Sequence, residues 1–548
     1  MAGNKPCVLI GWDGATFNLL EPWVKEGEMP NLAAMLSRGS ARKLRSIIPP
    51  VTPAAWISIL TGMNPGKHGV LDFNEFNASD YLQKEKLINS THMAGTTILD
   101  LLGERGLSVC SLQLPLTYPV WPIKGLMLAG IPNPDDSVSY TFPPDRNFGP
   151  LRPAKMRPQM SYPELFENHA FHINKLTDIT CEQMQAGYDF LCVYFRESDD
   201  FHHLYWRFLD PRSPGYDAKE AAEFGNPIKS IYKALDAALG RILAARPDAN
   251  YFLISDHGGA AMGMRRLYLN VWLGQHGYLK LKRSFLGTIG QLAYRGLKAI
   301  KPWLSWYKMQ NVQGKLGLGQ VAARMRSNAD AFDWTKSRAF AVLPCAPTAG
   351  IQVNLRGREA QGIVEPGAEY ERLRDELIDK MKALKDPATG RPVVLEVHRR
   401  EEVFSGPYLA RIPDIVMILD QEVMVRTDFG AGVWGNTRVS ELHDLSGEHD
   451  MDGIFAAAGE DVRGGGFLSP ASLLDVAPTL LYALGQPVPM NMDGHVLEDV
   501  FRPNFLASHA VSVADAQEVV AREGDDVYSE EEAAAIRSRL QDLGYLEE

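Results

Sequence analysis

Five short apolar runs recur along the first half of the chain, and each ends in a polar or glycine-containing turn. The runs are Cys7–Gly11, Leu107–Gln113, Gly125–Gly130, Asp189–Phe195 and Tyr251–Ser255. Most of their apolar residues follow one another without a regular polar alternation, which is typical of strands buried on both faces of a parallel sheet. Elsewhere, apolar positions recur at helical spacing, as in 227–245, and predict helices.

The predicted fold is therefore α/β, with a largely parallel central sheet, helices on both faces and an inserted cap. A chain of 548 residues is too long for one minimal domain. We assign residues 1–256 and 331–505 to the core and 257–330 to the cap, which extends as far as about 440 in the wider assignment. Residues 506–548 form a C-terminal tail, in which a capping box at Ser529 begins a helix over 530–543.

A proline-rich stretch, Ile48-Pro49-Pro50-Val51-Thr52-Pro53, leads into a short predicted helix over Ala54–Leu60. Proline disfavours helix in the residue before it, so the entry is extended. Thr52 is expected at the N-cap, with Pro53 at the first helical position. A helix start favours anions, so the Thr52 hydroxyl lies at an anion site. On this evidence alone Thr52 is only a capping residue, and it becomes a nucleophile if metals or a base lie beside it.

Acidic and histidine side chains follow several of the predicted strands directly. Ligand groups gather at the carboxyl ends of strands in open α/β sheets. Asp199 and His203 are four residues apart and share a face if that segment is helical. Carboxylate and imidazole groups together suit divalent ions, zinc first, with manganese or iron as alternatives. The full set of candidate ligands at strand ends and neighbouring loops is Asp13, Thr52, Asp199, His203, Asp256, His257 and His449.

Composition and charge exclude several classes of protein. The net charge is −11, so the surface as a whole does not favour nucleic acid. The five cysteines are scattered and form no C-x-x-C pair, which argues against a disulfide framework and a thiolate zinc site. The sequence contains no run of about 18 apolar residues, and no signal-peptide core precedes Cys7. We therefore expect a cytoplasmic protein without a membrane-spanning helix.

The segment from His257 to Ala329 contains twelve lysines and arginines and no acidic residue. In one interpretation it is a cap whose basic residues pair with acidic surface elsewhere in the chain. In a second, it concentrates a phosphate-bearing substrate over the metals. In a third, residues 284–308 contact an anionic membrane surface through Lys298, Trp303 and Trp306.

An ordered set of motifs resembles the alkaline phosphatase superfamily, and within it the type I phosphodiesterase/nucleotide pyrophosphatase branch and its bacterial phosphohydrolase/phosphomutase relatives. The resemblance spans roughly residues 7–500. The motifs are Gly11-Trp12-Asp13-Gly14, Thr52-Pro53-Ala54-Ala55-Trp56, Thr61-Gly62, His68-Gly69, Asp199-x-x-x-His203, Ser255-Asp256-His257-Gly258, Gly447-x-His449, Asp475-Val476-Ala477-Pro478-Thr479, Leu484-Gly485 and Asp493-Gly494.

The resemblance implies two metal ions and a threonine nucleophile. One ion would be held by Asp199, His203 and His449. The other would be held by Asp13, Asp256 and His257, with the Thr52 oxygen bound to it. Such a site would hydrolyse a small-molecule phosphate ester, preferably a diester or pyrophosphate, through a phosphothreonine intermediate.

One position departs from the family pattern. The phosphodiesterase branch carries a phosphate-binding asparagine twenty-one residues after the nucleophile, where this chain has Phe73, followed by Asn74. Asn74 takes the phosphate contact if the position shifts by one residue. The alternatives are a phosphomutase or other phosphoryl transferase, a phosphomonoesterase, and a metal-binding protein without turnover. A sulfatase is disfavoured, because it needs a cysteine where this chain has Thr52.

Overall fold

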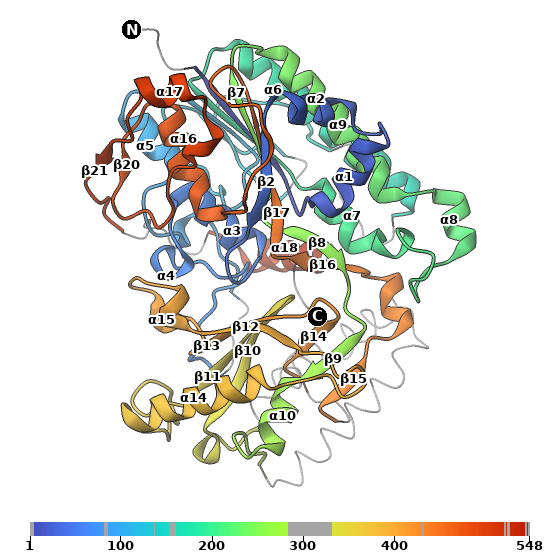
Figure 1. Ribbon diagram of the computed structural model, residues 1–548, viewed down its shortest axis with the longest axis vertical. Coiled ribbons are helices and arrows are strands. Elements are labelled where there is room, and N and C mark those ends of the chain that lie inside the picture. Colours follow the sequence, from blue (N-terminus) through green and yellow to red (C-terminus); the bar gives the residue numbers. More distant parts are fainter. Residues whose placement is uncertain are drawn as a thin grey trace.

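The computed structural model describes residues 5–81, 86–135, 138–152, 160–282, 331–428, 432–519, 522, 527–542 and 545. This part of the chain forms two lobes, each built on its own sheet (Figure 1). The larger sheet contains, in spatial order, β18 (Gly466–Phe467), β2 (Ser40–Arg45), β17 (Asp452–Ala458), β7 (Asn250–Ile254), β1 (Cys7–Trp12), β6 (Phe190–Phe195), β3 (Val109–Leu112), β4 (Gly125–Leu128) and β5 (Thr141–Phe142), and β19 (Ala471–Ser472) also pairs with β2.

The centre of this sheet confirms the predicted α/β fold. Strands β7, β1, β6, β3 and β4 are parallel neighbours, and they are the five apolar runs of the sequence. The sheet is mixed at its edges, because β17 runs antiparallel to both β7 and β2, and β5 runs antiparallel to β4. The sheet therefore has a parallel centre, with antiparallel strands on both sides of it.

Helices cover both faces, because the side chains of β1 alternate between two hydrophobic clusters. Cys7 and Leu9 belong to one cluster, and Val8 and Ile10 belong to the other. The first cluster is covered by α3 (Thr52–Thr61), α5 (Ile98–Glu104), α16 (Val476–Ala483) and α17 (Pro503–Ser508). The second is covered by α1 (Phe17–Lys25), α2 (Pro30–Arg38), α6 (Tyr162–Gln185) and α9 (Pro227–Ala245) (Figure 1).

Helix α3 is buried along its whole length. It begins at Thr52, with Val51 at the N-cap, so the predicted N-cap position of Thr52 was wrong by one residue. The ring of Trp56 lies against Gly11 in β1, where a Cβ atom would come within 2.5 Å of the ring. The close packing of α3 on β1 therefore requires a glycine at position 11. This packing brings the start of α3 to the carboxyl end of β1.

The second lobe contains a four-stranded antiparallel sheet with its own hydrophobic cluster. Its strands are, in spatial order, β10 (Ala339–Cys345), β11 (Thr348–Val353), β13 (Ile415–Leu419) and β12 (Val394–Arg399). Other elements of the lobe are α10 (Leu269–Gln275), α14 (Ala368–Lys382) and a small sheet of β14 (Val423–Arg426), β9 (Arg265–Tyr268) and β15 (Trp434–Asn436). We propose that the described residues of this lobe, 265–282, 331–428 and 432–436, belong to the inserted cap.

Most of the basic segment, from residue 283 to 329, lies outside the described residues, and so does the membrane contact predicted for 284–308. Two of its arginines are described, and both pair with acidic side chains. Arg265 lies 2.8 Å from Asp386, and Arg266 lies 2.5 Å from Glu441. These two contacts agree with a cap whose basic residues pair within the chain.

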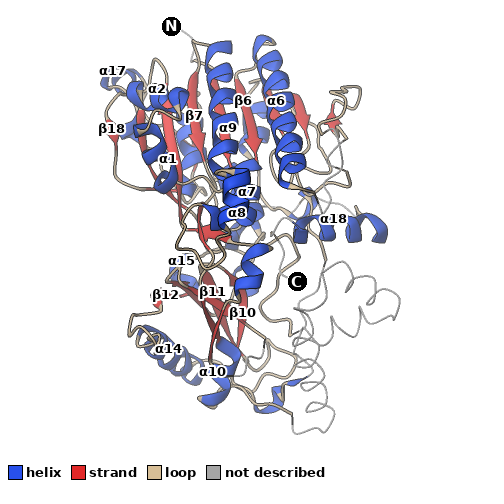
Figure 2. Cartoon of the chain, turned by 90° about the vertical axis from the view of Figure 1, so that its right-hand side faces the viewer, coloured by secondary structure: helices blue, strands red, loops and turns tan. Residues whose placement is uncertain are grey.

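The last helix of the described residues returns to the main lobe. Helix α18 (Glu530–Asp542) forms where a helix over 530–543 is predicted. Figure 2 shows α18 between the level of the large sheet and that of the second sheet. None of the described helices combines the length and the apolar character that crossing a bilayer requires. The five cysteines all lie in the described residues and form no disulfide bond with one another, as the sequence predicts.

Candidate functional site

The carboxyl ends of β7, β1 and β6 meet at one edge of the large sheet, because the three strands are parallel neighbours. Asp13 follows β1, Asp256 follows β7, and Asp199 lies in the first turns of α7 (Glu197–Tyr205), directly after β6. All three carboxylates are at most 1% exposed. The topology alone therefore collects three buried acidic groups at one point.

A short two-stranded ribbon brings His449 to the same edge. Strand β8 (Gly258–Ala261) follows His257 directly and pairs antiparallel with β16 (Gly447–Asp450). In this register His449 lies opposite Gly259. The His449 and His257 rings lie 3.9 Å apart between their centroids. The glycine opposite His449 answers to another contact, because a Cβ atom at Gly259 would lie 2.2 Å from Nδ1 of His202.

The first group of candidate ligands is Asp199, His203 and His449. Nε2 of His203 lies 3.2 Å from Oδ2 of Asp199 and 3.2 Å from Nε2 of His449. Nδ1 of His203 lies 3.1 Å from the carbonyl oxygen of Gly447. A proton on Nδ1 satisfies that carbonyl and leaves the Nε2 lone pair for a cation.

The second group is Asp13, Asp199 and His257, with Asp256 beside it. Nε2 of His257 lies 3.3 Å from Asp13, 3.5 Å from Asp256 and 3.5 Å from Oγ1 of Thr52. Nδ1 of His257 lies 3.0 Å from the carbonyl oxygen of Gly258, which again leaves Nε2 for a cation. Asp199 belongs to both groups, a sharing that the sequence does not reveal.

The charges of this cluster fit divalent cations. Within the described part of the chain, Oδ1 of Asp13, Oδ2 of Asp199 and Oδ2 of Asp256 are buried and make no hydrogen bond. Buried carboxylates are costly unless hydrogen bonds or cations compensate them. Carboxylate oxygens and imidazole nitrogens at this spacing are donors that zinc, manganese and iron accept.

The pKa values of the cluster without cations also show that its buried carboxylates lack compensating positive charge. Burial and the charges of Asp256 and Asp199 raise the pKa of Asp13 well above its usual value. Burial opposes ionisation of Asp199 as well, but the charges of His203 and His449 hold its pKa far below the usual range. Burial is likewise outweighed at His203, where Asp199 raises the pKa to about 9. Bound cations would replace the protons that this cluster otherwise takes up.

Two further side chains hold Asp13. The hydroxyl of Tyr194, in β6, donates a hydrogen bond to Oδ2 of Asp13, and Ser198 donates to its backbone carbonyl at 2.6 Å. Tyr194 was missed in the sequence because it lies within an apolar strand run. Its strand position between two apolar neighbours gives no signal of a contact across the sheet.

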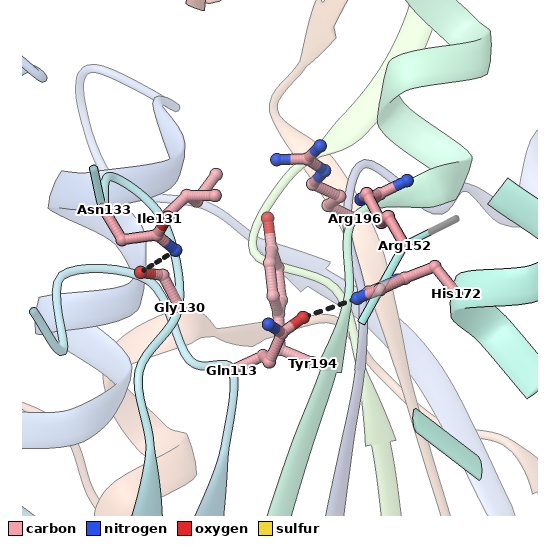
Figure 3. A pocket seen from close by; sticks show the side chains of 8 residues that line it. All are labelled: Gln113, Gly130, Ile131, Asn133, Arg152, His172, Tyr194 and Arg196. Carbon is pink, nitrogen blue, oxygen red and sulfur yellow. Dashed lines mark hydrogen bonds between the residues drawn. The ribbon is translucent and has the colours of Figure 1, made fainter. Parts of the chain in front are cut away.

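Tyr194 also lines a small polar pocket next to the cluster (Figure 3). His172 is central to it, since its Nε2 lies 2.6 Å from Gln113 and its Nδ1 lies 2.5 Å from Glu197. Burial lowers the pKa of His172 to about 4, so its imidazole is neutral at neutral pH. The polar lining includes Gln113, Asn133, Arg152, His172, Tyr194 and Arg196.

The remaining predicted residue is Asn74. It forms an isolated bridge with Leu87, and its buried Oδ1 makes no hydrogen bond to any described residue. Its neighbour Phe73 is completely buried and packs in a hydrophobic cluster with α18. The role of Asn74 as a phosphate ligand stays a prediction.

Comparisons with known proteins agree with this arrangement. The model of the family "Type I phosphodiesterase / nucleotide pyrophosphatase" matches residues 7–452. None of the curated proteins matches the sequence. Phosphonoacetate hydrolase from Sinorhizobium meliloti 1021, solved in complex with phosphonoformate, has 15% identity and a TM-score of 0.53, with 88% of this chain and 95% of that chain covered.

Two ectonucleotide pyrophosphatase/phosphodiesterase 5 structures are also similar, each covering 91% of this chain and 100% of its own. The murine protein has 13% identity and a TM-score of 0.45, and the human protein has 14% and 0.43. The phosphonoacetate hydrolase structure, at 15% identity, supports the fold alone, and the family model covers most of the sequence. The chain therefore belongs to the type I phosphodiesterase/nucleotide pyrophosphatase family, and it is a phosphoric ester hydrolase.

Proposed function

We propose that the protein is a metal-dependent phosphodiesterase or nucleotide pyrophosphatase-like hydrolase that uses Thr52 as its nucleophile. The observation that carries the proposal is the position of Thr52. Its hydroxyl is fully buried at the start of α3 and lies 3.5 Å from His257, among the candidate ligands. A threonine whose only role is to begin a helix does not require acidic and histidine side chains beside its hydroxyl.

Two divalent ions fit the ligand groups. Asp199, His203 and His449 would hold one, and Asp13, Asp256 and His257 the other, with Asp199 close to both. Zinc fits these mixed oxygen and nitrogen donors best, and manganese and iron are alternatives. When bound, such ions lower the pKa of a neighbouring hydroxyl and stabilise negative charge on a phosphoryl group.

The chain's own residues would carry out two displacements. The Thr52 oxygen forms a bond to phosphorus while the bond to the leaving oxygen breaks, and the leaving group takes up a proton. In the second displacement, a water oxygen would form a bond to phosphorus while the bond between Thr52 and phosphorus breaks, and a proton of that water restores the Thr52 hydroxyl. The first turn of α3 places its positive end toward the phosphoryl oxygens throughout. Asn74 would contact the phosphate of the substrate.

The test compares wild type, Thr52→Ala and Thr52→Ser on bis(p-nitrophenyl) phosphate and on p-nitrophenyl phosphate. We expect Thr52→Ala to lower kcat/KM at least about a thousandfold, since loss of a nucleophile removes a covalent pathway. Thr52→Ser keeps a hydroxyl and should retain part of the activity. A chelator should abolish turnover, and added zinc should restore it.

The outcomes separate the alternatives. Equal activity of wild type and Thr52→Ala would reject the threonine mechanism. Faster turnover of the monoester than of the diester would indicate a phosphomonoesterase. Transfer of the phosphoryl group to an added alcohol in preference to water would indicate a phosphoryl transferase. If the purified protein contains stoichiometric metal but hydrolyses neither ester, it is a metal-binding protein without turnover.

A further inference from the structure

Tyr545 comes from the far end of the described chain, yet it lies beside the candidate metal ligands. Its ring centroid is 5.8 Å from that of His203, in an edge-to-face arrangement. Its hydroxyl donates a hydrogen bond to Oδ1 of Asp200 at 3.1 Å. The side chain is 6% exposed, so the contact is part of the interior.

Helix α18 builds this position by packing. Ile536 and Leu540 of α18 form a separate hydrophobic cluster with Tyr545 and with Phe73 of the main lobe. The backbone N–H of Tyr545 donates to the carbonyl oxygen of Leu540 at 2.9 Å, which ties the residue to the end of the helix. Ahead of the helix, the Tyr528 hydroxyl donates to the carbonyl oxygen of Pro132 at 2.9 Å. The C-terminal segment is therefore fixed on both sides of α18.

Two aromatic rings meet next to the metal ligands. The centroids of Tyr545 and Phe73 lie 5.6 Å apart, also edge to face. Burial, with the charges of Asp200 and Asp199, raises the pKa of Tyr545. The phenol is thus neutral and remains a hydrogen-bond donor at the edge where β1 and β6 end.

We propose that Tyr545 is a specificity-determining residue, whose ring occupies the space beside His203 and limits the size of the group retained on phosphorus. This inference rests on the function proposed above, since it presumes that a phosphoryl group is held between Thr52 and the metal ligands. A small retained group leaves the aromatic pair undisturbed. A large one must displace the Tyr545 ring from its edge-to-face contacts with His203 and Phe73. Selectivity would thus come from a segment far along the chain from the nucleophile.

The kinetic test uses two diesters with the same leaving group, methyl p-nitrophenyl phosphate and phenyl p-nitrophenyl phosphate. The metal-containing full chain is compared with Tyr545→Ala and Tyr545→Phe, and Tyr528→Phe is the matched control on the same segment. We expect Tyr545→Ala to raise the phenyl-to-methyl ratio of kcat/KM at least about tenfold, the scale of steric discrimination in binding pockets. Tyr545→Phe and Tyr528→Phe should keep the wild-type ratio.

A change of both substrates by the same factor in Tyr545→Ala, or no change, would overturn the proposal by showing a purely structural role. A shift of the ratio in Tyr545→Phe equal to that in Tyr545→Ala would also overturn it, because the hydroxyl and not the ring would then set selectivity. Thermal melting identifies a variant that fails to fold, in which case Tyr545→Leu replaces Tyr545→Ala.

A binding measurement separates this inference from the proposed function. Calorimetry compares phenylphosphonate with methylphosphonate on wild type and Tyr545→Ala. The phenyl compound alone should bind more tightly to the alanine variant, again by about tenfold. If wild type hydrolyses neither diester, the proposed function fails, and this affinity ratio still decides the role of Tyr545. An unchanged affinity ratio would contradict it.

Discussion

At the scale of single residues, the site depends on a glycine that carries no chemistry. Gly14 has a φ of +64°, in the left-handed region that glycine adopts without strain. A Cβ atom at this position would lie 2.5 Å from Oδ1 of Asp199. Gly14 therefore allows the turn after β1 and leaves room for the carboxylate that both ligand groups share.

We predict that Gly14→Ala weakens zinc binding at least about tenfold, the scale seen when a supporting contact of a metal ligand is disturbed. The control is Gly27→Ala. Gly27 has a φ of +78° and no heavy atom within 4 Å of the added Cβ, so it takes the same backbone penalty, about 1–2 kcal/mol, without the clash. Zinc titration by calorimetry measures the affinities. Equal affinities in the two variants would show that the contact with Asp199 does not matter.

At the scale of elements, a buried histidine joins α3 to the short helix α4 (Pro65–His68). Nε2 of His68 lies 2.9 Å from Oγ of Ser58, in α3, and the backbone N–H of Val70 donates to Nδ1 at 3.2 Å. Since Nδ1 accepts, the proton of the neutral ring is on Nε2. Burial lowers the pKa of His68 to about 3. The helix that begins at the nucleophile is therefore held by a ring that must stay neutral.

This burial predicts acid sensitivity of the fold. An unfolded histidine has a pKa of about 6.5, so between pH 6.5 and about 3 the unfolded state binds a proton that folded His68 does not bind. The free energy of unfolding must then fall as the pH falls through this window, by about 2 kcal/mol at pH 5 from this residue.

Denaturant unfolding at pH 7.5 and pH 5 tests the prediction with His68→Gln, whose side chain does not titrate. The loss of stability between the two pH values should be about 2 kcal/mol smaller in this variant than in wild type. His443→Gln, at an exposed position, is the control and should behave as wild type. An identical pH dependence of wild type and His68→Gln would contradict the assignment.

At the scale of the whole molecule, the sequence predicts the sheet better than the site. The five central strands could be predicted because strands buried on both faces are apolar throughout. Strand β12 was missed, since its half-exposed sequence Val394-Leu-Glu-Val-His-Arg399 lacks that signal. The carboxylates Asp13, Asp199 and Asp256 could be placed at one edge because parallel strands end together.

Contacts set by tertiary structure could not be predicted. The register of β8 on β16 decides where His449 lies, and nothing local in either strand fixes that register. Tyr194 is hidden in an apolar run. Tyr545 reaches the site only because α18 folds back onto Phe73, a contact with no sequence period. The sharing of Asp199 between two ligand groups also follows from the packing of α7 against the end of β1.

The central claim is that hydrolysis proceeds through a covalent bond between Thr52 and phosphorus. The most direct measurement is the stereochemical course at phosphorus, with a phosphorothioate diester of known configuration hydrolysed in isotopically labelled water. Two successive in-line displacements, the first by Thr52 and the second by water, predict net retention of configuration. Inversion would show that water attacks the ester directly, and would contradict the account.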